Sequence, residues 1–545
     1  MPAYALVLSV LVTAPLLAPG YLLLRDAVST PRSYVTDAAL GLTEAAPRAL
    51  PQDFAVALAS SVLDGGVVVK ALLLAGLAAA GWGAARLVGH VLFDAGLAGR
   101  FTAATLAIWN PYVAERLLQG HWSLLVGYGC LPWVAVSVLR LRERASWTPV
   151  APLVFWMALA GLTPTGLVLA ATVALVCVAA PGDGWRRARV AGLGLGVAVA
   201  AACPWLVAAF VSGAVSSSPD PGAGVRAFAA RAEPGLATLG SLAGLGGIWN
   251  GDAVPASRTS LFAVVATVVL LGVVAAGLPV VARRRAAVPL LVLAAGAVIM
   301  PALMASAPGL VVVEALIDAV PGLGIVRDGQ KWVALAMPGY ALAAGAAPMM
   351  LRRLRIPAAA AAAVCCAALI AVLPDLTWGV GNQMRAVRYP QSWAQVAATI
   401  NADPRPVVAL PADSIREFSW AGTVLDPLPR WLRADVLTTG DLLIGGRTVP
   451  GEGARARAVQ GLLRDGASPQ QLAEAGVGWL VRETDSGITA QRIGGEAPSS
   501  PHRGLLIAAH LVWLAALAGG ALGLVAGRVG RVLSRRTWRH RPRPG

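Results

Sequence analysis

Two carboxylates stand out in the polar segment, residues 25–65, that follows the first long apolar run of the chain. Asp37 is the first candidate for chemistry, because it lies near the middle of the segment with Tyr34 close by. Asp53 is the second, just before a weakly amphipathic stretch of the kind that lies in a membrane interface. A carboxylate at a membrane surface can take the proton of a sugar hydroxyl as a general base. We therefore predict a catalytic role for Asp37 or Asp53, the alternative being a solvated loop whose charges only face water.

A second polar segment, WNPYVAERLLQGHW at residues 109–122, joins two further apolar runs. It contains Glu115 and His121, which would lie at or near membrane depth. Ionisable side chains are costly there and tend to be functional. We predict that both residues position a substrate. The alternative is that Glu115 pairs with Arg116 and that His121 lies among hydrated lipid headgroups.

A third segment, GLGIVRDGQKW at residues 322–332, leads directly into an apolar run. Arg327 and Lys331 are four residues apart and would share one face of a helix that started there. Two cations at a membrane surface can bind a phosphate or pyrophosphate group. The alternative is a pair of cations that extend to the headgroups and are partly neutralised by Asp328. Lys331 is one of only two lysines in the chain, which favours the phosphate-binding role.

The composition places these segments in a membrane protein. Hydrophobic residues make up 57% of the chain and charged residues only 13%, which is more apolar surface than a soluble protein of this length can bury. The net charge of +16 does not indicate nucleic-acid binding, because the arginines gather at the ends of apolar runs. That placement follows the positive-inside rule. The clusters are Arg140–Arg144, Arg186–Arg189, Arg283–Arg285, Arg352–Arg355 and the tail from Arg528 to Arg543.

The arginine clusters also predict the topology. About twelve apolar runs approach the roughly 20 residues that a helix needs to cross a bilayer. If the N-terminus is cytoplasmic, every arginine cluster is cytoplasmic and all three polar segments face outward. The first run, Tyr4 to Leu24, lacks the basic start and the cleavage site of a signal peptide and reads as a retained span. Because arginine replaces lysine, as in GC-rich bacterial genomes, we expect a multi-pass protein of a bacterial inner (plasma) membrane with both termini in the cytoplasm.

Residues 375–502 differ from the rest of the chain in having the composition of a soluble domain. Residues 406–410 and 477–482 predict buried strands, and residues 454–464 and 469–475 predict helices. The fold class that we expect is therefore an all-α polytopic membrane protein with a small extracytoplasmic α/β domain. Its expected parts are a transmembrane core over 1–374, the α/β domain over 375–502, a last membrane helix over 503–527 and a basic cytoplasmic tail over 528–545.

The sequence predicts no metal site. The five cysteines lie in apolar runs, and none has metal-ligand spacing with a histidine. The sequence motifs of a Walker loop, GxSxG, HExxH and CxxC are absent. The cofactor is therefore unknown, and the participation of a divalent metal stays open.

This arrangement resembles the GT-C superfamily of membrane glycosyltransferases. The segments WNPYVAERLLQGHW and IVRDGQKW look like those of large actinobacterial envelope proteins of the arabinofuranosyl- and mannosyltransferase kind. The resemblance implies a polyprenyl-phosphate-linked sugar as donor, an acidic residue in the first outer loop and an outer domain near the C-terminus. It implies that Asp37 matches the first-loop acidic residue and that Arg327 and Lys331 face the donor phosphate. One departure concerns the first loop, which has no Asp-x-Asp or Asp-Glu pair, so the resemblance leaves metal dependence and activity open.

The leading hypothesis is a transferase that moves a sugar from a polyprenyl phosphate to a cell-envelope glycan or glycolipid on the outer face of the membrane. Two alternatives belong to other classes. A lipid or polysaccharide transporter would need polar residues deep in several spans, and the apolar centres of the later spans offer few. A non-catalytic protein of envelope assembly would use residues 375–502 to bind partners.

Overall fold

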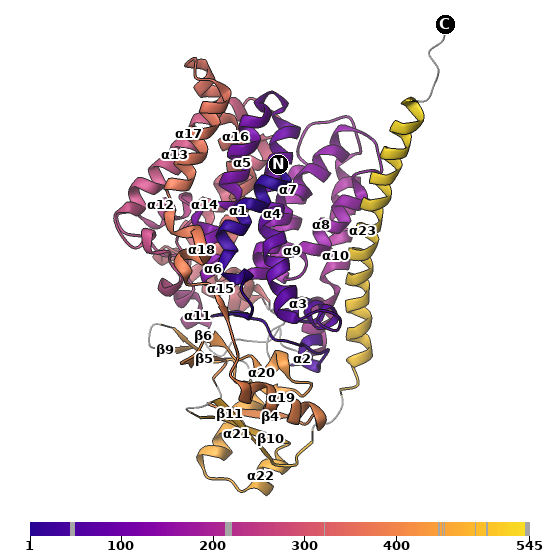
Figure 1. Ribbon diagram of the computed structural model, residues 1–545, viewed down its shortest axis with the longest axis vertical. Coiled ribbons are helices and arrows are strands. Elements are labelled where there is room, and N and C mark those ends of the chain that lie inside the picture. Colours follow the sequence, from indigo (N-terminus) through magenta and orange to yellow (C-terminus); the bar gives the residue numbers. More distant parts are fainter. Residues whose placement is uncertain are drawn as a thin grey trace.

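The computed structural model describes residues 1–43, 49–212, 221–320, 322–411, 413–444, 447–449, 451, 453–484, 487–496 and 500–539. Most of the elements are helices, which pack side by side into one bundle, and a small α/β domain lies at one end of that bundle (Figure 1). We call this end of the bundle the domain face. The chain therefore combines a helical membrane part with a few small sheets, as the expected fold class requires.

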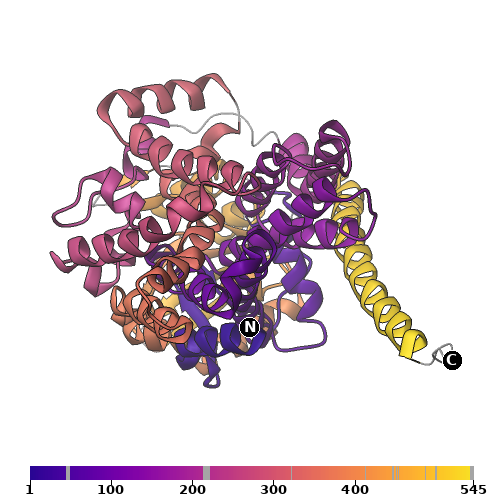
Figure 2. The ribbon, with the colours of Figure 1, turned by 90° about the horizontal axis from the view of Figure 1, so that it is seen from above.

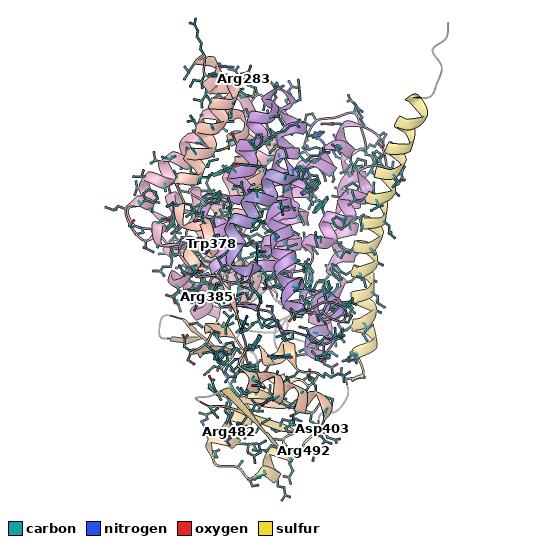
Figure 3. All side chains as sticks on the ribbon, in the orientation of Figure 1. Arg283, Trp378, Arg385, Asp403, Arg482 and Arg492 are labelled. Atoms are coloured by element: carbon teal, nitrogen blue, oxygen red, sulfur yellow. The ribbon has the colours of Figure 1, made fainter. Side chains whose placement is uncertain are left out.

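The opposite end of the bundle is rich in arginine, and we call it the arginine face. Arg283 marks this end in Figure 3, whereas Arg482 and Arg492 lie on the far side of the α/β domain. Two clefts open on the arginine face. Arginines line both of them: Arg86, Arg100 and Arg140 in one, and Arg283, Arg284 and Arg353 in the other.

A helix lies at each apolar run that the sequence predicts to cross the membrane. These helices are α1 (Pro2–Thr13), α4 (Gly65–Val91), α5 (Gly96–Ile108) with α6 (Pro111–Leu118), α7 (Trp122–Glu143), α8 (Val150–Ala160), α9 (Pro164–Cys177), α10 (Arg187–Ser212), α13 (Phe262–Val281), α14 (Val288–Met304), α16 (Met337–Arg353), α17 (Ala358–Ala371) and α23 (Arg503–Arg539). Helix α7, for example, starts at Trp122, which lines a cavity at the α/β domain, and Arg140 near its end lines a cleft of the arginine face.

Not all of these helices have the length of a full span. Six of the described helices are long and apolar enough to cross a membrane, or up to eight if each of two bent pairs forms one span. One pair is α14 with α15 (Ala307–Ala319), bent by 92°, and the other is α17 with the helical segment Pro374–Asn382, bent by 77°. A multi-pass membrane protein is thus confirmed, whereas the count of about twelve spans stays a prediction.

The first helix is shorter than the sequence predicts. The apolar run from Tyr4 to Leu24 does not form one helix, because α1 ends at Thr13 and a 3-10 turn over Ala14–Leu17 follows. Pro15 lies in that turn, and a proline removes a backbone donor and blocks a continuing helix. The last four residues of the run form strand β1 (Tyr21–Leu24) instead.

The α/β domain is built on a four-stranded sheet in the order β11-β10-β4-β7. Strand β4 (Val407–Leu410) runs parallel to both of its neighbours, β7 (Val436–Leu437) and β10 (Trp479–Thr484). Because side chains alternate along a strand, Val407 and Ala409 enter one apolar core while Val408 enters another on the opposite side of the sheet. The remaining elements are β11 (Gly487–Arg492), the hairpins β5 (Ile415–Phe418)–β6 (Gly422–Leu425) and β8 (Leu442–Ile444)–β9 (Arg447–Val449), and the helices α19 (Gln391–Ala402), α20 (Leu428–Trp431), α21 (Ala454–Arg464) and α22 (Pro469–Glu474).

Both predicted strands and both predicted helices of this domain are confirmed within one or two residues of their expected ends. The first core contains a group of aromatic rings, among them Trp393 of α19, Phe418 of β5 and Trp431 of α20. The second core lies under α21 and α22, whose Val459 and Leu472 pack against it. The sheet is therefore buried on both faces, as is usual for parallel strands.

Backbone pairing joins the domain to the start of the chain. Strand β1 pairs on one side with β2 (Ala27–Val28) and on the other with β3 (Ala386–Val387). The next residue, Arg25, continues the connection, because its N–H donates to the carbonyl of Thr423 at 2.8 Å and its own carbonyl accepts from Leu425 N–H at 2.7 Å. The turn between β1 and β2 is thereby fixed between the bundle and the domain.

The last helix, α23, runs from the domain along one flank of the bundle (Figures 1 and 2). It packs against α8 and α10, and the indole N–H of Trp513 donates to the carbonyl of Ala158 at 2.9 Å. The helix is described as far as Arg539. The remainder of the expected basic tail, residues 540–545, lies outside the described residues.

Candidate functional site

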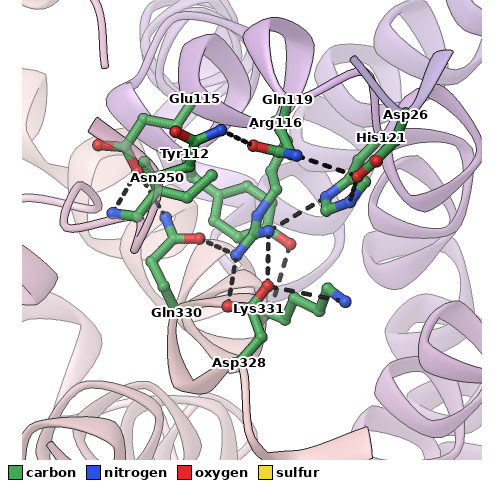
Figure 4. Close-up of polar contacts among 11 residues, drawn as sticks. Asp26, Tyr112, Glu115, Arg116, Gln119, His121, Asn250, Asp328, Gln330 and Lys331 are labelled. Atoms are coloured by element: carbon green, nitrogen blue, oxygen red, sulfur yellow. Dashed lines mark hydrogen bonds and ion pairs between the residues drawn. The ribbon is translucent and has the colours of Figure 1, made fainter. Parts of the chain in front are cut away.

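Side chains from all three predicted polar segments meet at the domain face (Figure 4). The first segment contributes the turn between β1 and β2, and the second contributes α6 with the turn after it. The third contributes Asp328 and the first residues of a 3-10 helix (Gly329–Ala336) just before α16. We call the group the polar cluster; it comprises Asp26, Tyr112, Glu115, Arg116, Gln119, His121, Asn250, Asp328, Gln330 and Lys331.

Helix α6 is short, and local sequence defines its start. Asn110 caps it, because its side-chain oxygen accepts from Val113 N–H at 3.1 Å and its amide donates to the carbonyl of Leu106 at 2.8 Å. Pro111 follows at the first helical position, where a missing N–H costs nothing. All eight residues of the helix are buried. Its charged side chains therefore need partners inside the protein.

Arg116 of α6 finds its main partner in Asp328. Two parallel hydrogen bonds of 3.0 and 3.1 Å join the guanidinium to the two carboxylate oxygens, and the side chains are 0% and 4% exposed. A third contact from the same guanidinium goes to the side-chain oxygen of Gln330. Burial alone would raise the pKa of Asp328, but Arg116 and Lys331 outweigh it and hold that pKa below its usual range. Asp328 is therefore ionised.

Lys331 shares the same carboxylate but keeps its own charge accessible. Its Nζ lies 3.6 Å from Oδ2 of Asp328, and its side chain is 25% exposed. The Tyr112 hydroxyl donates to the backbone carbonyl of Lys331 at 3.2 Å, which fixes the chain at that point. Because Asp328 is already bonded to Arg116 on both oxygens, two cations share one carboxylate. The net charge around Lys331 and its neighbours Arg116 and Asp328 is positive, which suits an anionic group of a ligand.

The four-residue spacing predicts that Arg327 and Lys331 share one face of an α-helix, but no α-helix covers these residues. The α-helix begins only at Met337, and the residues before it form a 3-10 helix. The Arg327 guanidinium lies over the ring of Phe228, 4.3 Å from its centre. Arg327 thus borders the polar cluster, and its phosphate-binding role stays a prediction.

His121 lies between the guanidinium of Arg116 and the carboxylate of Asp26. Its Nδ1 is 3.1 Å from Nη1 of Arg116, and its Nε2 is 2.9 Å from Oδ2 of Asp26. Because arginine can only donate, Nδ1 must accept, so the neutral ring carries its hydrogen on Nε2 and donates it to Asp26. Burial lowers the pKa of His121 and favours this neutral form.

Asp26 is the most accessible carboxylate of the polar cluster, with a side chain that is 37% exposed. Its Oδ2 accepts from His121 and also from the Gln119 amide at 3.0 Å, and Gln119 is held in turn by Asn250 at 2.8 Å. Both bonds fall on Oδ2, so Oδ1 has no hydrogen-bond partner among the described residues. Burial acts to raise the pKa of Asp26, but the bonds from His121 and Gln119 and the charge of Lys331 outweigh it and keep the pKa low. Asp26 therefore presents an ionised, oriented carboxylate with one open oxygen.

Glu115 points the other way, into the protein. Its carboxylate accepts from the backbone N–H groups of Gly247 and Ile248 at 3.1 and 3.2 Å and from the Gln330 amide at 2.9 Å. The pair with Arg116, which was the alternative to a substrate-positioning role, is not among the ion pairs of the described residues. Glu115 connects α6 to the loop around residue 247 and to the segment that carries Lys331.

The two carboxylates predicted to be catalytic lie outside the polar cluster. Asp37, at the start of helix α2 (Asp37–Leu40), forms an ion pair with Arg503 at the start of α23. Asp53, in helix α3 (Gln52–Ala59), accepts from Arg430 of the α/β domain at 3.2 Å. The structure thus brings Glu115, His121 and Lys331 together, but not Asp37 and Asp53 with them.

Three residues that organise the polar cluster were not predicted as site residues: Asp26, and Arg116 and Asp328, which entered only as partners in the alternatives. The pair of Lys331 with Asp328 that one alternative supposes is present. The main partners of the three residues are distant in the chain, since Arg116 and Asp328 are 212 positions apart, and spacing cannot reveal such a pair. The sequence does carry one indication that Asp26 lies close to the membrane surface: it is only two residues after Leu24, where the first apolar run ends. Among the residues that the structure describes, no three His, Cys, Asp or Glu side chains are grouped so that they could hold a metal ion.

Comparison with known proteins adds information on the fold. No protein-family model matches the chain, and no curated protein matches it. Among solved structures, the chain is similar to a cryo-EM structure of the arabinofuranosyltransferase AftD from Mycobacteria, with a TM-score of 0.53 and 18% identity over 89% of this chain and 36% of that one. A second conformational class of the same mutant protein gives a TM-score of 0.47 with the same coverage. The chain thus spans about a third of the length of AftD, and the likeness shows that it shares the fold of that part of the arabinofuranosyltransferase.

Proposed function

We propose that this protein is a GT-C-type membrane glycosyltransferase that moves a sugar from a polyprenyl-phosphate donor to a cell-envelope glycan or glycolipid. One observation carries the proposal: Asp26 offers an ionised carboxylate with an open oxygen in the same polar cluster as the accessible ammonium of Lys331. A base beside a phosphate-binding cation is what such a transfer needs. The fold shared with an arabinofuranosyltransferase makes arabinofuranose the first donor sugar to test.

The roles of the residues follow from their contacts. Oδ1 of Asp26 takes the proton of the acceptor hydroxyl. The oxygen of that hydroxyl then forms a bond to the anomeric carbon of the donor sugar. The bond from this carbon to the phosphate oxygen breaks, and the polyprenyl phosphate leaves with the electron pair. Lys331, with Arg327 at the border of the cluster, stabilises the charge that grows on the phosphate. His121 orients Asp26, and Glu115 holds the loop around residue 247 against the site.

The orientation of the membrane belongs to the same proposal. Arginines gather on the face opposite the α/β domain, and cytoplasmic ends of membrane proteins carry this excess. We therefore place the arginine face and both termini in the cytoplasm, and the polar cluster with the domain outside. The donor would then be a lipid-linked sugar of the outer leaflet of a bacterial plasma membrane.

A transfer assay with purified protein in lipid nanodiscs tests the proposal. The donors are polyprenyl-phosphate-linked arabinofuranose and mannose, each carrying a radioactive label, and the acceptors are envelope glycans of the same bacterium. We expect Asp26→Asn to lower transfer by about 10²- to 10⁴-fold, the usual contribution of a general base.

Asp94→Asn is the matched control, because Asp94 is also paired and is 36% exposed, but on the arginine face. It should transfer like the unmodified protein. Equal transfer by Asp26→Asn and the unmodified protein would exclude Asp26 as the base. No transfer by the unmodified protein from either donor would argue against the proposed activity.

A further inference from the structure

A cavity of about 230 Å³ lies beside the polar cluster, between the first loop and the α/β domain. It shares two chain segments with the cluster, because Val28 lies two residues after Asp26 and Trp122 directly follows His121. The lining of the cavity thus includes residues that are close in sequence to the proposed base and to His121. Its polar and aromatic lining includes Tyr34, Asp53, Trp122, Ser414, Asp426 and Arg430.

An ion pair across the cavity joins the two parts of the protein. Oδ1 of Asp53 accepts from Nε of Arg430 at 3.2 Å and from the Gln52 amide at 3.0 Å. The side chains of Asp53 and Arg430 are 22% and 16% exposed, so each remains in contact with the cavity. The second oxygen of Asp53 and the two Nη groups of Arg430 make no hydrogen bond with the described residues. The second oxygen of Asp53 can therefore accept a hydrogen bond from a ligand, and the Nη groups of Arg430 beside it can donate.

The other lining groups favour a neutral ligand with many hydroxyls. Ser414 accepts from Gly440 N–H at 3.1 Å, so its own O–H can still donate. Trp122 and Tyr34 add aromatic atoms to the lining, and the guanidinium groups of Arg32 and Arg433 lie over the Tyr34 ring at 5.2 and 5.3 Å from its centre.

Asp426, which is 3% exposed, adds a second carboxylate to the lining. Each of the two carboxylates is paired with a guanidinium, Asp53 with Arg430 and Asp426 with Arg416, so the charges of these pairs balance. A balanced pair of charges suits a neutral ligand, because two neighbouring hydroxyls can bond to a carboxylate and a guanidinium together.

The volume limits the size of the ligand. Pockets for drug-sized molecules usually measure about 300–1,000 Å³, and this cavity is smaller. It can hold about one sugar ring, so an oligosaccharide would enter with its end only. The phosphate of the donor would remain at Lys331, which does not line this cavity.

We propose that this cavity binds the terminal sugar ring of the acceptor glycan and presents its hydroxyl to Asp26. This inference rests on the proposed transferase function and assigns the acceptor to a place of its own. It gives Asp53 the task of binding the acceptor sugar together with Arg430, in place of the catalytic task that its position in the sequence predicts.

Steady-state kinetics with separate variation of donor and acceptor tests the inference. Arg430→Gln and Asp53→Asn should each raise the KM for the acceptor by about 10- to 100-fold, as expected for losing a hydrogen bond to a charged group. The KM for the donor and kcat should change less than about twofold. Arg405→Gln is the matched control, since Arg405 is 21% exposed and paired with a carboxylate, Asp403, on the far side of the domain.

A binding measurement separates this inference from the proposed function. Saturation-transfer NMR with methyl arabinofuranoside and methyl mannoside should detect binding to the unmodified protein and to Asp26→Asn, and no binding to Arg430→Gln. If the protein transfers no sugar but binds a glycoside through Arg430, the transferase proposal fails and the cavity assignment survives. The assignment would be overturned if the acceptor KM stayed unchanged in both Arg430→Gln and Asp53→Asn. It would also be overturned if the KM for the donor rose as much as the KM for the acceptor.

Discussion

Arg116 and Asp328 form a buried, two-pronged ion pair at the centre of the polar cluster, with hydrogen bonds of 3.0 and 3.1 Å. The pair joins α6 to the segment that leads into α16. His121 contacts the Arg116 guanidinium on one side, and Lys331 contacts the Asp328 carboxylate on the other. The position of the proposed base and that of the proposed phosphate-binding cation therefore depend on one interaction.

Breaking this pair should destabilise the protein. Arg116→Met leaves the Asp328 carboxylate buried without its main partner, which typically costs about 3–5 kcal/mol. The double variant Arg116→Met/Asp328→Leu should recover part of that loss, because no unpaired charge remains. Thermal unfolding in nanodiscs measures both. The exposed pair of Arg284 and Asp94 is the control, and Arg284→Met should cost at most about 1 kcal/mol; an equal loss from both single variants would contradict the prediction.

Removing the charge of Lys331 should slow transfer. We expect Lys331→Gln to lower kcat by about 10²- to 10³-fold, the range observed when a group that stabilises a developing anion is removed. Lys331→Arg should restore part of the rate because it keeps the charge. Lys70→Gln is the natural control, since Lys70 is the other lysine and donates to the backbone carbonyl of Ala18 at 3.0 Å. Loss of activity in Lys70→Gln but not in Lys331→Gln would reverse the assignment.

The buried histidine of the cluster should make stability depend on pH. Burial lowers the pKa of His121, with the charges of Lys331 and Arg116 acting in the same direction and Asp26 opposing them. A free histidine titrates near pH 6.5, so below that pH the unfolded chain binds more protons than the folded one. The stabilising contribution is therefore complete above about pH 6.5 and is lost as the pH falls through the lowered pKa of the folded state.

The measurement is the unfolding temperature between pH 8 and pH 5.5. The unmodified protein should lose stability toward acid, and His121→Gln should lose less over the same range. His502→Gln changes an exposed histidine just before α23 and should behave like the unmodified protein. Identical pH dependence in all three proteins would show that His121 does not titrate as described.

The ion pair between Asp37 and Arg503 separates two roles for the first loop. If Asp37 is structural, Asp37→Asn and Arg503→Gln should each change transfer less than about fivefold and cost at most about 1 kcal/mol, because Arg503 is 43% exposed. A catalytic Asp37 would instead give a loss of about 10²-fold or more in Asp37→Asn alone. We expect the first result, and the transfer assay decides between them.

Much of the fold could be predicted because it follows from local patterns. Apolar runs predicted the helices, and buried runs such as PVVAL predicted the strands of the α/β domain. The end of the first helix could not be predicted from hydrophobicity, since Tyr21–Leu24 is as apolar as a span. Pro15 interrupts the helix, and the residues after it form a strand that pairs with β2 and with β3, which lies far along the chain. The sequence predicted which three polar segments form the site. It did not predict which carboxylate belongs to the site, because that depends on contacts between the segments.

Asp26 illustrates that limit. In sequence it is one of several acids in the first loop, and Asp37 lies more centrally. Its orientation arises from Gln119 and His121, which are over 90 residues away. Spacing within a loop carries no record of such partners, so the candidate base could be found only after the segments were placed in space.

The pairing of β1 with β3 has a consequence for biosynthesis. The Tyr389 hydroxyl donates to the carbonyl of Ser29, which was made 360 residues earlier. At about 5–20 residues per second, a ribosome needs roughly 20–70 s to cover that distance. During this interval the turn that carries Asp26 lacks its backbone pairing with β3 and with the β5–β6 hairpin, so this pairing forms only after most of the helical bundle has emerged.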